Sequence, residues 1–100
     1  MVLLEFSIYP LDKGVSLSPY VARCVDVIDR SGLPYEMHAM GTLIEGEYDA
    51  LMAVVRQCFE SLRTDCDRIV CSLKFDYRKG AQHPMHDKVA SVELCRNKAS

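Results

Sequence analysis

The sequence predicts a single α+β domain, residues 1–100, in which strands and helices follow the order β-α-β-β-α-β and a short C-terminal helix ends the chain. Three observations predict it. Apolar and polar residues alternate over 2–10, 34–45 and 67–77, apolar residues recur at steps of three and four over 18–31 and 47–63, and Pro or Gly marks most of the junctions. One hundred residues are enough for one hydrophobic core without a metal or disulfide.

Residues 2–10 alternate as a strand that Pro10 ends. Leu4, Phe6 and Ile8 share one face, which we expect in the core. The opposite face carries Glu5, Ser7 and Tyr9, a mixed set that can include groups facing a ligand.

The first helix follows a loop over residues 11–17. Ser18 is predicted as its N-cap and Pro19 as its first helical residue, because both types favour those positions. Gly32 fits the position just after the helix.

A hairpin and the most regular helix come next. We expect one strand over residues 34–40 and a short second strand that ends at Glu45, with Gly41 between them. Gly41 is expected to take a positive φ in a tight turn, and Gly46 to do so at the junction with the next helix. The helix over 47–63 has a continuous apolar stripe, and Glu47 and Asp49 in its first turn suit the helix dipole.

Residues 67–77 form the fourth predicted strand, and residues 85–96 are ambiguous between a short helix, which we favour, and an added strand. The element order matches the ferredoxin-like split-βαβ sandwich. Two helices would cover one sheet face. The other face is expected to carry a mixed set that suits a ligand or a partner subunit: Glu5, Ser7, Tyr9, His38, Met40, Ser72, Lys74 and Asp76.

Composition narrows the function classes. A net charge of -2 and the absence of an aromatic ribonucleoprotein signature argue against nucleic-acid binding. No run of 18 apolar residues exists, so we expect no membrane span. Five cysteines, without a CxxC pair, favour a reduced cytosolic protein without a disulfide framework.

One polar constellation is a candidate binding site. The split-βαβ topology places the first strand between the third and fourth, so Ser7, Thr42, Glu45 and Asp76 can converge on a neutral or cationic ligand with several N–H donors. The alternative is a sheet face that is solvated or contacts another subunit.

Other polar groups are weaker candidates. Ser16 and Ser18 before the first helix could hold a phosphate or carboxylate, but we favour ordinary capping as their role. His83 and His86, with Asp87, could bind a metal ion, but no third metal ligand lies at a diagnostic spacing. We expect these residues in a surface loop. No catalytic motif is present, so we expect no enzyme and no cofactor.

Several segments together resemble the YkoF-like family of small thiamine-binding proteins. They cover nearly the whole chain in order: residues 5–11, 16–21, 31–35, 40–42, 45–47, 88–89 and 91–93. The loop at Asp12-Lys13 and the stretch 79–87 depart from the family pattern.

The resemblance implies a cytoplasmic, non-enzymatic homo-oligomer, a dimer or tetramer, that binds thiamine or its hydroxymethylpyrimidine precursor. It implies ligand contacts at Ser7, Tyr20, Thr42, Glu45 and Asp76, and Tyr9 or Tyr20 could stack on the pyrimidine ring. The alternative is a structural or regulatory oligomer whose open sheet face serves assembly alone.

Overall fold

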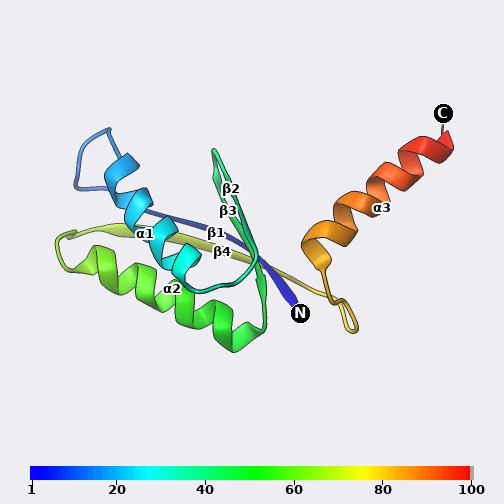
Figure 1. Ribbon diagram of the computed structural model, residues 1–100. Helices are drawn as coiled ribbons and strands as arrows, with labels where there is room; N and C mark the ends of the chain where they lie inside the picture. Colours follow the sequence, from blue (N-terminus) through cyan, green and yellow to red (C-terminus); the bar gives the residue numbers. More distant parts are fainter. Residues whose placement is uncertain (100) are drawn as a thin grey trace.

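The computed structural model describes residues 1–99, which form a four-stranded sheet with two helices on one face and a third helix projecting from one end (Figure 1). The elements follow the predicted order. They are β1 (Val2–Pro10), α1 (Ser18–Arg30), β2 (Tyr35–His38), β3 (Gly41–Gly46), α2 (Tyr48–Arg63), β4 (Ile69–Tyr77) and α3 (Pro84–Ala99).

The sheet has the strand order β2-β3-β1-β4, and every neighbouring pair is antiparallel. This confirms the ferredoxin-like split-βαβ fold, because each helix joins two parallel strands that a third strand separates. β1 pairs with β4 along its whole length but with β3 only from Val2 to Phe6.

The core lies between the sheet and the two helices, and the even-numbered side chains of β1 point into it as predicted. Leu4 and Phe6 are at most 2 % exposed and pack with the apolar stripes of α1 and α2, including Ile28, Leu51 and Leu62. Truncating such a buried Leu typically costs about 2–5 kcal/mol of folding free energy.

Two predicted details at element ends are wrong. The N-cap of α1 is Leu17, and Ser18 is already helical. Gly46 is the last residue of β3 and has no positive φ. Gly41 takes the predicted positive φ, 158°, although residues 39–40 form the turn and Gly41 begins β3 directly after it. Gly41 is also needed for space, because a Cβ there would lie 3.0 Å from the backbone oxygen of Phe6. Gly32 does take the positive φ predicted after α1.

The ambiguous C-terminal segment is a helix, longer than the stretch predicted over 85–96. Its first turn is fixed to the open sheet face: the Met85 N–H donates to Glu45 Oε1 at 3.1 Å, and Lys88 forms an ion pair with Asp76. The rest of α3 extends away from the body, with Val89, Val92 and Leu94 more than half exposed (Figure 1). Among the described residues, no helix is both long and apolar enough to cross a membrane.

Candidate ligand-binding groove

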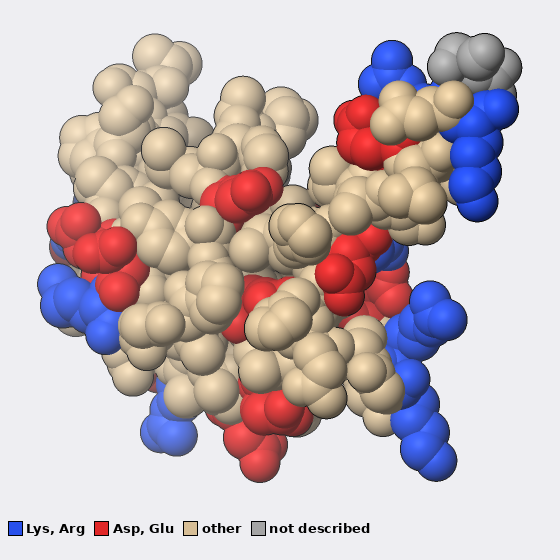
Figure 2. All heavy atoms as spheres, turned by 45° about the vertical axis from the view of Figure 1, so that its right-hand side comes forward, with Lys and Arg blue, Asp and Glu red and all other residues tan. Residues whose placement is uncertain are grey.

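A groove of about 810 Å³ opens between α1 with its preceding loop and the β2–β3 hairpin. This volume lies within the range of about 300–1,000 Å³ found for small-molecule sites. Both flanking segments rise beyond the sheet on the same side (Figure 1), and in the space-filling view they form the two lobes at the upper left with a notch between them (Figure 2). Apolar side chains dominate the walls: Val15, Leu17, Val21, Met37 and Met40.

The groove exists because β3 leaves β1 early. The register between them ends at Phe6 and Thr42, so β1 has no strand partner on that side from Ser7 onward. Backbone N–H and C=O groups alternate in direction along a strand. The Phe6 oxygen points toward Gly41 on β3, so the N–H and C=O of Ile8 point the same way, into the groove.

Several side chains add polar groups to this apolar space, among them those of Thr42, Ser7 and Asp26. Thr42 is only 6 % exposed and lies at the base of the groove, where its hydroxyl has no hydrogen-bond partner within residues 1–99. Ser7 lines the groove from β1. Asp26 is exposed on α1, and its carboxylate forms no hydrogen bond or ion pair with another described residue. A hydroxyl that lines a recess and has no protein partner can accept from or donate to a ligand.

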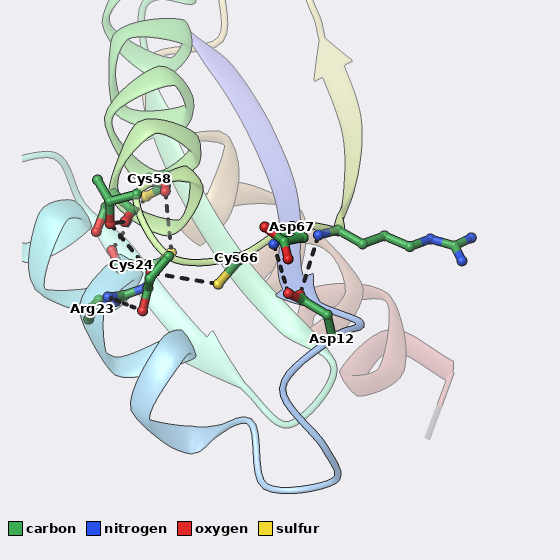
Figure 3. Close-up of polar contacts among 10 residues, drawn as sticks. Asp12, Arg23, Cys24, Cys58, Cys66 and Asp67 are labelled. Atoms are coloured by element: carbon green, nitrogen blue, oxygen red, sulfur yellow. Dashed lines mark hydrogen bonds and ion pairs between the residues drawn. The ribbon is translucent and has the colours of Figure 1, made fainter.

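The cationic side chains near the groove are directed elsewhere. Arg23 on α1, labelled in Figure 3, donates both of its Nη groups to Asp65, at 2.8 and 3.3 Å. Its guanidinium also lies over the Tyr20 ring. These hydrogen bonds hold the pKa of the Asp65 carboxyl below its ordinary value. Lys13, in the loop before α1, contributes to lowering the pKa of both Asp12 and Asp65, which places its charge on that side.

Asp12 fixes the loop that precedes α1. Its carboxylate accepts from the backbone N–H groups of Asp67, at 2.7 Å, and Arg68, at 3.3 Å (Figure 3). The bond from Asp67 is the main cause of the lowered pKa of Asp12. The loop wall of the groove is thereby tied to the start of β4.

A pair of buried thiols lies where α1 crosses α2. Cys24 Sγ lies 3.9 Å from the Cys58 carbonyl, and Cys58 Sγ lies 3.6 Å from the Cys24 carbonyl. The hydrogen bond with Cys24 and burial raise the pKa of the Cys58 thiol. Both thiols pack as small apolar groups, and the raised pKa makes Cys58 a poor nucleophile.

The structure divides the predicted site residues between two places. Ser7, Tyr9 and Thr42 line the groove. Glu45 and Asp76 both pair with Leu3 across the open face, where they hold the first turn of α3. Thr42 pairs with Phe6 and so lies on the helix-covered face, which means that the four polar side chains predicted to converge do not form one cluster.

Tyr20 and Met40 lie elsewhere than the sequence predicted. Tyr20 packs against the core beneath Arg23 and is not part of the groove. Met40, predicted on the open sheet face, belongs to the hairpin turn and lines the groove instead. Asp26 also lines the groove and was not singled out from the sequence. Its only signal was a polar position beside the apolar stripe of the first helix.

No metal site is formed within residues 1–99, where no group of three or more His, Cys, Asp or Glu side chains is placed to hold an ion. His86 contacts Asp87 at 3.3 Å on the surface. The α1 N-terminus is equally poor as an anion site, because Pro19 has no N–H and the amides of Tyr20 and Val21 both donate to Leu17.

The fold and the groove define a small ferredoxin-like protein with a ligand-sized recess beside the first strand. A family model described as thiamine-binding protein matches residues 4–93, and the chain belongs to this family. A UPF0045 protein of Methanocaldococcus jannaschii is 36% identical over 91 residues, which is 91% of either chain. A UPF0045 protein of Synechocystis is 40% identical over 93 residues, covering 92% of this chain and 77% of that protein.

Solved structures agree with this relationship. The crystal structure of the M. jannaschii protein superposes with a TM-score of 0.86 at 36% identity, covering 92% of this chain and 95% of that one. A candidate thiamine biosynthesis or salvage protein from Thermotoga maritima superposes with a TM-score of 0.80 at 25% identity, covering 91% and 97%.

Proposed function

We propose that this protein binds thiamine or a hydroxymethylpyrimidine-type precursor in the groove, without catalysing a reaction, as a cytoplasmic homo-oligomer. The observation that carries the proposal is the hydroxyl of the nearly buried Thr42, which has no hydrogen-bond partner within residues 1–99 and lines an apolar recess in a chain of the thiamine-binding family. An apolar recess with a few placed polar groups is the usual form of a small-molecule site.

The aminopyrimidine ring suits the open edge of β1. Its exocyclic amine donates and its neighbouring ring nitrogen accepts, so that edge complements the N–H and C=O of Ile8 much as another strand would. Thr42 and Ser7 can bond the remaining polar atoms, and Tyr9 offers a ring for stacking. Glu45 and Asp76 would act indirectly, by holding α3.

Isothermal titration with hydroxymethylpyrimidine and thiamine tests the site. Thr42→Val keeps the side-chain shape but removes the hydroxyl, and we expect affinity to fall about three- to tenfold, the value of one hydrogen bond. Ser72→Ala is the matched control, because Ser72 lies directly opposite Ser7 on β4 but does not line the groove. Equal affinities for wild type and Thr42→Val would remove Thr42 from the site. Absence of binding by the wild type would contradict the function itself.

The second candidate is an oligomer whose surfaces serve assembly alone, and β4 is the observation that favours it. β4 is a nine-residue edge strand, and Leu73, Phe75 and Tyr77 on its helix-facing side are 38–67 % exposed. Long exposed edge strands tend to pair with another chain. Native mass spectrometry of freshly purified protein separates the two: a co-purified pyrimidine supports the binder, and an empty oligomer that no ligand stabilises supports assembly alone.

A further inference from the structure

The lining of the groove includes an acidic side chain but no lysine or arginine. This charge affects which ligands the groove accepts. Asp26 is the carboxylate among these lining residues. His38 also lines it, but its Nε2 lies 3.6 Å from the Glu36 carboxylate, so this pair adds no net positive charge. The notch between the two lobes in Figure 2 shows no lysine or arginine on the drawn face.

The segments that build the groove do contain cations, and their placement excludes them from it. Arg23 is bonded to Asp65, Lys13 lies toward Asp12 and Asp65, and Arg30 lies in the last turn of α1 outside the lining. The α1 N-terminus leaves only the Ser18 amide free in its first turn, because Pro19 lacks an N–H and the next two amides donate to Leu17. A phosphate needs several such donors or an Arg or Lys partner.

We propose that the groove selects cationic or neutral unphosphorylated ligands and rejects their phosphate esters, with Asp26 as the residue that sets this charge preference. This inference rests on the proposed function and names the ligand class of the same site. Asp26 lies on the α1 wall opposite the hairpin, where its charge attracts the thiazolium of thiamine and repels a phosphoryl group. A neutral hydroxymethylpyrimidine would be indifferent to that charge.

Four ligands test this selectivity by isothermal titration at low ionic strength: hydroxymethylpyrimidine, thiamine, thiamine monophosphate and thiamine diphosphate. We expect the wild type to bind thiamine at least about tenfold more tightly than the diphosphate, with thiamine affinity falling as salt is added. Asp26→Asn should weaken thiamine about three- to tenfold and leave hydroxymethylpyrimidine unchanged. Asp26→Lys should reverse the order of thiamine and its diphosphate.

Asp49→Asn is the control, since it makes the same change in net charge at an exposed position on α2, away from the groove. Equal or tighter binding of the phosphate esters by the wild type would overturn the inference and leave the proposed function standing. An unchanged thiamine affinity in Asp26→Asn would also overturn the inference and leave the proposed function standing. If none of the four ligands bound to any variant, the proposed function and the inference would both be overturned.

Discussion

Glu45 is a buried carboxylate with a structural partner. It is 5 % exposed, and its Oε1 accepts the Met85 N–H at 3.1 Å, in the first turn of α3, where the helix dipole favours a negative charge. The neighbouring Asp76–Lys88 ion pair holds the same turn. The two residues therefore connect the body of the domain to the projecting helix.

Removal of this carboxylate should loosen α3 and spare the groove. We expect Glu45→Ala to cost about 1 kcal/mol of folding free energy, as for the loss of a helix cap. It should also speed hydrogen exchange of the first α3 amides while ligand affinity stays at the wild-type value. Glu93→Ala, on the exposed part of α3, is the control. A large loss of affinity in Glu45→Ala alone would instead return Glu45 to the binding site.

The Arg23–Asp65 pair gives a pH dependence of known sign. Hydrogen bonds from Arg23 lower the pKa of Asp65 in the folded state. The pair therefore stabilises the fold fully at pH values above the unfolded-state pKa of about 3.9. This stabilisation is lost as the pH falls through the lower pKa of the folded state. Asp65→Asn should therefore lower the melting temperature at pH 7, with a smaller difference from wild type at pH 3. Asp67→Asn, whose side chain forms no ion pair within residues 1–99, should show no such trend.

Thiol reactivity tests the burial of the cysteines. Cys24, Cys58 and Cys66 are buried, whereas Cys71 and Cys95 are exposed. Since the thiolate is the reactive form, the raised pKa of Cys58 adds to its burial in slowing reaction. In a thiol-labelling time course followed by peptide mass spectrometry, Cys58 should react on the timescale of unfolding, and Cys95 within the mixing phase. Equal rates for these two would contradict the packing of α1 against α2.

Among the strands, β4 is the one whose burial in the structure differs most from the burial that its sequence pattern predicts. Its alternating pattern predicts a strand with one buried face, yet all residues from Cys71 to Tyr77 are exposed in the single chain. The two helices mainly cover β1 and β3 and leave the helix-facing side of β4 partly open. A second chain is the covering that such an edge invites.

A charge on that side of β4 should weaken assembly. We expect Leu73→Lys to shift a native mass spectrum toward the monomer, because a lysine on an apolar edge opposes strand pairing. Lys74→Ala changes the neighbouring residue on the opposite face and should leave the mass distribution unchanged unless that face also takes part. An unaltered oligomer in Leu73→Lys would exclude this edge from the interface.

The sequence was informative about elements and less so about their relations. Apolar periodicity located the four strands and the first two helices, because both periods are local properties that burial imposes, whereas the exposed C-terminal helix stayed ambiguous. The groove depends on where β3 stops pairing with β1, and neither strand marks that point in its own residues. Asp26 was missed because its place beside the groove depends on how α1 packs near the hairpin. Thr42 was wrongly grouped with Glu45, since residues three positions apart in one strand lie on opposite sheet faces.

For the whole molecule, family membership and the groove support the same proposal, that a free, unphosphorylated pyrimidine binds beside the open edge of β1. Amide chemical-shift mapping of the isotope-labelled full chain, titrated with hydroxymethylpyrimidine and then thiamine, locates the ligand without mutation. The proposal predicts the largest shifts at Ile8, Thr42 and the α1 amides around Asp26. Shifts centred on Leu3, Glu45 and Asp76 instead, or no shifts at saturating ligand, would contradict it.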